Sequence, residues 1–352
     1  MDYHGGEIKE KIEYDFSVNI NPLGMPEYVK DAIYESVRLA DSSVTNHINS
    51  LCSYPDRHCS ELRQKIACIE NVDASEILCG NGASELIMAV CAYSAVSKAE
   101  GHIHALMAAP TFSGYERAVK AYGGEVDYYK DCDALKSILK DGATPDLLFI
   151  CNPNNPTGEA ADGTAVRQII EMSASKNILV VVDECFIDFT HKESLTGFIN
   201  GHDNLIVLKA FTKFYAMAGI RLGYMCASDK LCEKIAGCLP EWNVSGLAQV
   251  AGCAAYESID KVEKWKQKTL DLVDKEREFL LHELAGMVVA DSKANFLLCK
   301  CDDKDICSKL QDIGVLVRDC GNFNGLDSSY FRICVSTHEN NEKMINALKG
   351  LI

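Results

Sequence analysis

The sequence predicts an α/β fold with a large domain on a mostly parallel sheet, followed by a smaller α+β domain. Three observations support this. The length of 352 residues suits roughly two domains of about 150 residues each. Short apolar, β-branched runs alternate with longer helical patterns through the middle of the chain, as repeated βα units require. After about residue 229 helical patterns come first and strand-like runs return later.

The elements follow in this order. The strand candidates of the large domain are 76–79, 104–108, 125–129, 146–151, 178–183 and 204–209. Residues 84–97 have helical apolar spacing and should pack on the sheet. Residues 230–237 and 247–284 predict helices, and 295–301, 314–318 and 330–335 predict strands. We therefore expect an N-terminal segment, 1–40, that joins the small domain, a large domain, 41–229, and a small domain, 230–352.

Composition and charge limit the classes of partner. With 47% hydrophobic and 24% charged residues, the chain is expected to form a packed interior. A formal net charge of −16 opposes binding to nucleic acid or to an anionic membrane, so we expect neither. Any anionic ligand must then be held by a local cluster of donors. No apolar run approaches the ~18 residues of a membrane span and no leader pattern is visible, which predicts a cytoplasmic protein.

The cysteines predict neither disulfides nor a metal site. There are 17, scattered along the chain, and many lie in apolar runs, such as Cys79, Cys91 and Cys226, as reduced core residues do. Cys299 and Cys301 share one face of a strand-like run, but two thiols are too few to predict a metal centre.

Polar residues follow three consecutive strand candidates. Asn155 lies in a loop after the first, Asp183 ends the second, and Lys213 follows the third, at spacings of 28 and 30 residues. Ligands of open α/β sheets bind beyond the carboxyl ends of the strands. The amide, the carboxylate and the lysine are therefore expected to meet in one site.

This trio has a specific chemical meaning. A lysine traps a carbonyl only as the neutral amine or as an imine already formed. A carboxylate at the far end of a pyridine ring keeps the ring nitrogen protonated, so that the ring accepts electrons from a substrate carbanion. An amide donor beside the ring's phenolic oxygen fits the same arrangement. The cofactor that these residues indicate is pyridoxal 5'-phosphate.

The cofactor phosphate and ring need further partners. Residues 80–84 join a strand to a helix, where free backbone N–H groups favour a dianion. Thr212 offers a hydroxyl, Arg221 a bidentate guanidinium, and Phe112 a face for ring stacking. Nucleotide-binding, zinc-protease and serine-hydrolase motifs are absent from the sequence.

These motifs, from His4-Gly5-Gly6 to Arg332, resemble those of fold-type-I, pyridoxal-phosphate-dependent enzymes of the class I/II aminotransferase superfamily. The resemblance implies a mostly parallel seven-stranded sheet and a homodimer with shared active sites. It implies that Lys213 is the Schiff-base lysine, that Asp183 pairs with the pyridine nitrogen, and that Arg332 binds the substrate α-carboxylate. The other implied cofactor contacts are Asn155 to the ring oxygen, Phe112 by stacking, Ala83, Ser84, Thr212 and Arg221 to the phosphate, and Tyr54 to the phosphate of the neighbouring subunit.

Two subfamilies compete within this resemblance: L-threonine-O-3-phosphate decarboxylases, which supply the aminopropanol phosphate arm of cobalamin, and histidinol-phosphate aminotransferases. The motif at 4–6, the run at 15–24 and the sequence at 212–215 favour the decarboxylase. Phe186 does too, because it replaces a tyrosine that in the aminotransferases bonds the ring oxygen. Ala210 departs from a hydroxyl residue common three positions before the lysine, which removes about one hydrogen bond of ~1 kcal/mol.

The choice of reaction has a physical basis in orientation. The bond to Cα that breaks is the one held perpendicular to the cofactor ring, so the groups that grip the substrate select decarboxylation or transamination. We expect Arg332 to hold the carboxylate, and His4 and Arg318 to contact the phosphate of a phosphorylated amino acid. Lys213 would then move the proton. A cofactor-sensing regulator is the alternative outside enzymes, and it would need a DNA-binding domain for which we see neither length nor charge.

Overall fold

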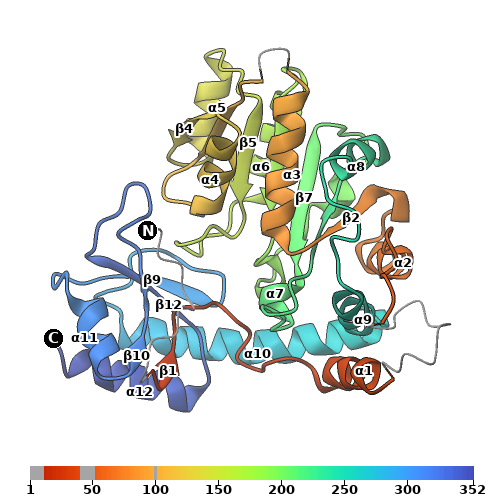
Figure 1. Cartoon of the computed structure of the whole chain (residues 1–352). Coiled ribbons are helices and arrows are strands. Elements are labelled where there is room, and N and C mark those ends of the chain that lie inside the picture. Colours follow the sequence, from red (N-terminus) through yellow and green to blue (C-terminus); the bar gives the residue numbers. More distant parts are fainter. Residues whose placement is uncertain (1–11, 40–51, 99–100) are drawn as a thin grey trace.

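The computed structural model describes residues 12–39, 52–98 and 101–352. Its large sheet has seven strands in the order β2-β8-β7-β6-β5-β3-β4 (Figure 1). Six of them run parallel, and β8 (Gly223–Cys226) is antiparallel to β2 and β7 on its two sides. The predicted mostly parallel sheet is confirmed.

The six strands predicted for this sheet are all present. They are β2 (Ile77–Gly80), β3 (His104–Ala108), β4 (Glu125–Tyr129), β5 (Leu147–Cys151), β6 (Leu179–Asp183) and β7 (Leu205–Ala210). Each end lies within one residue of the prediction. The strand β8 was not predicted.

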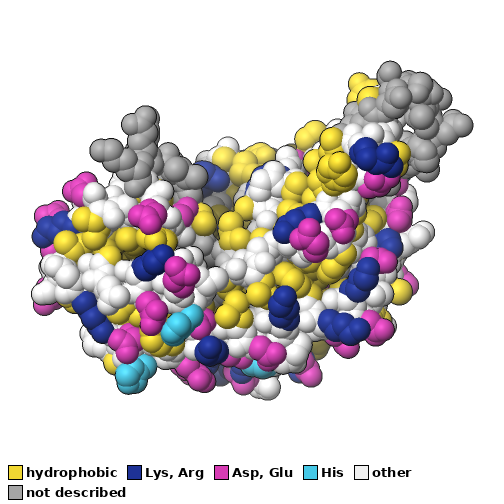
Figure 2. Space-filling view, turned by 90° about the horizontal axis from the view of Figure 1, so that it is seen from below, with side chains coloured by type: hydrophobic (Ala, Val, Ile, Leu, Met, Phe, Trp, Pro, Cys, Tyr) yellow, Lys and Arg dark blue, Asp and Glu magenta, His cyan; other side chains and the backbone are white. Residues whose placement is uncertain are grey.

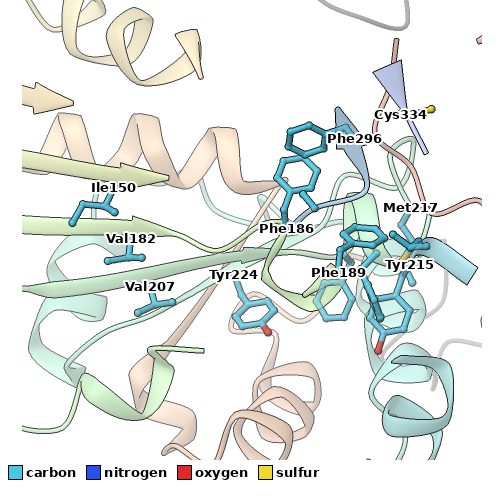
Figure 3. Close-up of a cluster of buried hydrophobic side chains, with 14 of the residues drawn as sticks. Ile150, Val182, Phe186, Phe189, Val207, Tyr215, Met217, Tyr224, Phe296 and Cys334 are labelled. Atoms are coloured by element: carbon cyan, nitrogen blue, oxygen red, sulfur yellow. The ribbon is translucent and has the colours of Figure 1, made fainter. Parts of the chain in front are cut away.

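Helices cover both faces of the large sheet. One face packs against α3 (Ala83–Val96), α4 (Ser113–Ala121) and α8 (Asp229–Ala236), and the other against α2 (Ser60–Glu70), α5 (Cys132–Lys140) and α6 (Gly163–Ala174). Successive strand residues point to opposite faces of the sheet. In β5, Phe149 therefore packs in the first core, under α3, α4 and α8, and Ile150 packs in the second core, under α2, α5 and α6. Figure 3 shows Ile150, Val182 and Val207 side by side on neighbouring strands of the second core.

The C-terminal part forms a smaller α+β unit. Its three-stranded antiparallel sheet has the order β11 (Arg318–Asp319), β12 (Tyr330–Cys334), β9 (Phe296–Lys300), and it carries α11 (Ile306–Asp312) and α12 (His338–Lys349). A separate parallel pair joins β1 (Tyr14–Asp15) to β10 (Val315–Leu316). The single strand predicted for 314–318 is therefore wrong. This segment forms two short strands instead: β10 pairs with β1, β11 pairs with β12, and Val317 lies between them.

The two parts are joined by α10 (Ile259–Glu283), whose 25 residues span about 38 Å. It runs beneath both parts in Figure 1, beside α9 (Gly246–Ala255) and α1 (Glu27–Arg38). The Ser258 Oγ accepts a hydrogen bond from the Lys261 N–H and caps α10, so the helical pattern at 247–284 becomes two helices. The short helices are α7 (Phe211–Phe214), η1 (Ala74–Glu76), η2 (Ile187–Phe189) and η3 (Thr196–Phe198).

All 17 cysteines lie in the described part of the chain and all are free thiols there. Within residues 12–39, 52–98 and 101–352, no cluster of side chains could hold a metal ion, and no helix is long and apolar enough to cross a membrane. Figure 2 shows acidic and basic side chains interspersed over the face formed by the underside of Figure 1.

Candidate active site

A pocket of about 210 Å³ lies where β5, β6 and β7 end, beside the start of α3 and facing β11 and β12. It brings together most of the predicted site residues. These are Ala83, Ser84, Phe112, Asn155, Asp183, Phe186, Thr212, Lys213, Arg221, Arg318 and Arg332. The expected convergence of three strand ends on one site is therefore observed.

Two predicted residues are not placed in this pocket. Tyr54 is 77% exposed, its ring lies 4.7 Å from that of Trp242, and it does not line the pocket of its own chain. Its contact with a neighbouring subunit stays a prediction. His4 lies outside the described residues.

Lys213 lies on α7, directly after β7, and its side chain reaches the pocket. Burial, together with the positive charges of Arg332 and Arg221, lowers the pKa of its amine to about 8. A substantial fraction of the amine is then neutral near physiological pH, as a carbonyl-trapping lysine requires.

A second buried lysine lies four residues earlier, and its environment is opposite. Lys209 Nζ is 2.8 Å from Glu70 Oε1 and 3.6 Å from Asp188 Oδ1. Although burial opposes the charge, Asp188 and Glu70 hold the pKa of Lys209 well above its usual value. Lys209 is therefore a permanent cation, and Lys213 is the one of the two suited to act as a nucleophile.

Asp183 ends β6 with both carboxylate oxygens held. Tyr115 Oη donates to Oδ2 at 2.6 Å, and the Cys185 N–H donates to Oδ1 at 3.0 Å. The Tyr115 ring is buried, stacked on Phe149 at 4.8 Å. Burial and the nearby Asp183 charge raise the pKa of Tyr115 well above its usual value, so it remains a donor. The sequence analysis missed Tyr115. Its contact with Asp183, 68 residues further along the chain, is created by packing, so no local pattern in the sequence indicated it.

The start of α3 forms an anion cradle with Arg221. The backbone N–H groups of the first helical turn, including Ala83 and Ser84, point out of the helix at its positive end. Gly82 has a φ of +79°, and a Cβ there would come within 2.5 Å of Arg221 Nη2. Only glycine lets the guanidinium lie this close. Arg221 itself has a φ of +60°, an unusual conformation of the kind found at functional sites.

Arg332, on β12, enters the pocket from the small domain. Its guanidinium donates to Asn155 Oδ1 and, at 2.8 Å, to the Ser17 carbonyl, and its buried Nε has no hydrogen-bond partner. No carboxylate of the described residues lies within ion-pair distance of it. Burial lowers the pKa of Arg332 to about 10, which still leaves it charged at neutral pH. A buried cation of this kind favours an anionic ligand.

Arg318, on β11, is the direct cross-strand neighbour of Arg332. It is buried, donates to the Asp319 carbonyl at 2.6 Å and to Asn322 Oδ1 at 2.9 Å, and lies over the Phe323 ring. Like charges opposite each other on neighbouring strands destabilise a sheet, unless something compensates them. The charged residues lining the pocket are one carboxylate, Asp183, and four cations, Lys213, Arg221, Arg318 and Arg332. The site is locally basic in an acidic chain.

Several lining residues were not predicted as site residues. They are Ser17, Val18, Asn19, Ile87, Ser113, Tyr115, Cys151, Cys185, Ala210 and Phe323. Ser17, Val18 and Asn19 belong to the N-terminal motif at 15–24, which was used only as a mark of resemblance. Its place in the sequence gave no indication that it would line a pocket formed by residues far along the chain.

The fold and this pocket define an α/β enzyme with a lysine poised at the strand ends. A model of the family described as aminotransferase class I and II matches residues 11–348, so the chain belongs to this family. The threonine-phosphate decarboxylase of Salmonella typhimurium is 33% identical, over 99% of this chain and 96% of that protein. The histidinol-phosphate aminotransferase of Thermoanaerobacter pseudethanolicus is 31% identical, over 96% and 93%.

Solved structures give the same two subfamilies. The histidinol-phosphate aminotransferase of Clostridium acetobutylicum superposes with a TM-score of 0.83 at 28% identity, covering 96% of this chain and 98% of that one. The L-threonine-O-3-phosphate decarboxylase of Porphyromonas gingivalis superposes with a TM-score of 0.75 at 25% identity, with the same coverage. The predicted fold type is confirmed, and overall similarity does not separate the two activities.

Proposed function

We propose that the chain is a pyridoxal-phosphate-dependent enzyme acting on a phosphorylated amino acid or amine, with L-threonine-O-3-phosphate decarboxylase as the first candidate. Histidinol-phosphate aminotransferase is the second. The observation that carries the proposal is the pair Arg318 and Arg332, buried, adjacent on neighbouring strands and facing one pocket. Two guanidinium groups suit a substrate with two anionic groups, such as a carboxylate and a phosphate.

The residues present fit pyridoxal 5'-phosphate. Gly82, which has no Cβ, and the start of α3 leave an anion cradle completed by Arg221. We propose that Ala83, Ser84, Thr212 and Arg221 hold the phosphate, that Phe112 stacks on the ring, and that Asp183 binds the ring nitrogen. When bound, the cofactor supplies an aldehyde for the lysine amine and a pyridinium ring that accepts electrons.

The chain's own groups then bind the substrate and move a proton. Arg332, held by Asn155 and the Ser17 carbonyl, binds the α-carboxylate, and Arg318 binds the phosphate, with His4 as a further proposed contact. Two fixed anchors restrict rotation of the substrate and so determine which bond to Cα is labile. Lys213 Nζ, with its lowered pKa, accepts and returns a proton beside Cα.

Phe186 favours the decarboxylase over the aminotransferase. It lines the pocket, and its ring packs edge-on against that of Phe296 with 5.0 Å between the ring centroids. Figure 3 shows these two rings next to each other. Phe186 offers no hydroxyl to the cofactor's ring oxygen, which leaves the Asn155 amide as the proposed donor. The product, an aminopropanol phosphate, would serve cobalamin synthesis.

We also propose a homodimer with shared sites and the division into 1–40, 41–229 and 230–352. Tyr54 and Trp242 support the dimer, because two aromatic rings in contact remain 77% and 42% exposed on one chain. A partner subunit would cover them.

The test is to load the protein with pyridoxal phosphate and supply O-phospho-L-threonine. Release of CO2 with formation of the phosphorylated amine is the expected result. Amino transfer from histidinol phosphate to 2-oxoglutarate without CO2 release would assign the second candidate. If the loaded protein catalyses neither of these reactions, the proposal is contradicted.

A further inference from the structure

We propose that Asn322 is a positioning residue that holds Arg318 toward the pocket, which makes the loop 320–326 the element that selects phosphorylated substrates. This inference rests on the proposed function, because it assigns Arg318 to the substrate phosphate. It adds a residue that neither the sequence motifs nor the lining of the pocket identified.

Arg318 and Arg332 are held in different ways, although they are direct neighbours across two strands. Arg332 is fixed from the large domain and the N-terminal segment, by Asn155 and the Ser17 carbonyl. Two of the acceptors that hold Arg318 come from its own loop: the Asp319 carbonyl at 2.6 Å and Asn322 Oδ1 at 2.9 Å. The Asn322 contact can therefore be removed without changing the contacts of Arg332 with Asn155 and Ser17.

The chemistry of the Asn322 contact supports a binding role. An amide oxygen accepts from the guanidinium Nη2 without bringing a negative charge. Asp319, the acidic residue next to Arg318 in the sequence, directs its carboxylate elsewhere: its Oδ1 accepts a hydrogen bond from the Gly321 N–H at 2.7 Å. The Asp319 carbonyl and Asn322 thus orient Arg318 without adding a negative charge, and a guanidinium binds a dianion through charge-assisted hydrogen bonds.

The loop is rigid enough to position a side chain. Phe323 is buried with Leu298 and Cys320, and its ring lies beneath the Arg318 guanidinium at 5.4 Å. The Cys320 N–H donates to the Tyr330 carbonyl at 2.9 Å, and the Phe323 N–H donates to the Cys320 carbonyl at 3.0 Å. Asn322 therefore extends from a fixed backbone, and an exposed residue on such a backbone can be replaced without loss of the core.

Asn324 provides a matched control. It lies in the same loop, is exposed like Asn322, and lies near Tyr128 on β4. Asn324→Ala removes a loop amide of the same size and leaves the contact with Arg318 in place.

The experiment compares Asn322→Ala, Asn322→Asp and Asn324→Ala in the loaded enzyme. With O-phospho-L-threonine, or with histidinol phosphate if that is the substrate, Asn322→Ala should raise KM about fivefold with kcat nearly unchanged. Asn322→Asp should raise KM at least about tenfold, because a carboxylate beside Arg318 repels the phosphate. Inhibition by inorganic phosphate should weaken in parallel. The inhibition constant of unphosphorylated L-threonine or histidinol, and the thermal midpoint, should not change.

Three results would overturn the inference: an unchanged KM in both Asn322 variants, an equal loss for phosphorylated and unphosphorylated ligands, or an equal loss in Asn324→Ala. Its failure is distinguishable from that of the proposed function. A wild-type enzyme that acts on neither phosphorylated substrate contradicts both. A wild-type enzyme that acts on one, with Asn322 variants that match it, contradicts only the role of Asn322.

Discussion

Tyr115 Oη donates a hydrogen bond of 2.6 Å to Asp183 Oδ2 inside the protein. Asp183 is only 6% exposed, and a buried charge is tolerated only where donors compensate for lost water. With the Cys185 N–H on the other oxygen, Asp183 is held in one orientation at the end of β6. The site is therefore organised by a residue that does not belong to the lysine–aspartate–asparagine trio.

Replacing Tyr115 by phenylalanine should destabilise the cofactor-free protein by about 2 kcal/mol, because a hydrogen bond to a buried charge is lost. Urea unfolding measures this. Tyr129→Phe is the control, since Tyr129 is also buried but donates to a neutral acceptor, the Phe149 carbonyl, at 2.9 Å. Its loss should be about 1 kcal/mol. Equal losses in the two variants would contradict the special role of Tyr115.

The capture of pyridoxal phosphate by Lys213 should depend on pH. Its pKa is lowered from 10.5 to about 8, and only the neutral amine attacks the aldehyde. The rate should therefore rise with pH through about 8 and level off above it. Arg332→Gln removes a neighbouring positive charge and should move this rise to higher pH. Stopped-flow absorbance measures the rate. A rise that begins only near pH 10 in the wild type would show that Lys213 is not perturbed.

Lys209 should matter for stability, not for chemistry. Lys209→Met leaves Glu70 buried beside Tyr224 without its cation, which should cost about 3 to 5 kcal/mol in the free energy of unfolding. The double variant Glu70→Gln/Lys209→Met should recover much of this loss, because the buried Glu70 charge is then removed and Asp188, whose side chain is 25% exposed, keeps contact with water. If the double variant is as unstable as the single one, the ion pair is not the cause.

Arg332 should act through the geometry of its guanidinium as well as its charge. Arg332→Lys keeps a cation but loses the planar fork that binds a carboxylate with two parallel hydrogen bonds. We expect kcat/KM to fall by about 100-fold or more in Arg332→Lys and further in Arg332→Gln. Inhibition by inorganic phosphate, which needs no carboxylate site, should change little. A lysine variant with wild-type kinetics would exclude Arg332 as the carboxylate anchor.

The fold could be predicted in detail where local pattern determines it. β5, β6 and β7 are buried, apolar runs that are followed by polar residues, and the topology then brings Asn155, Asp183 and Lys213 together. β8 was missed because Gly223–Cys226 is a four-residue run without a clear pattern of alternating hydrophobicity. It forms a strand because it pairs with β2 and β7 on its two sides. Such a pairing joins segments that are distant in the sequence.

The limits of the site prediction have the same origin. Pocket residues that are proposed to contact a ligand, such as Arg221 and Arg332, could be identified from motifs. Tyr115 and Asn322 could not, because their importance lies in contacts with other side chains that only packing creates. Tyr54 is a third case, since its predicted role requires a second subunit.

The central claim is that Lys213 carries the cofactor, and borohydride reduction of the loaded protein tests it most directly. Reduction should fix a pyridoxyl group on the protein, and peptide mass spectrometry should find it on Lys213. Lys209, four residues away and held as a cation by Glu70 and Asp188, should remain unmodified. A label on Lys209, or no label after saturation with the cofactor, would contradict the account.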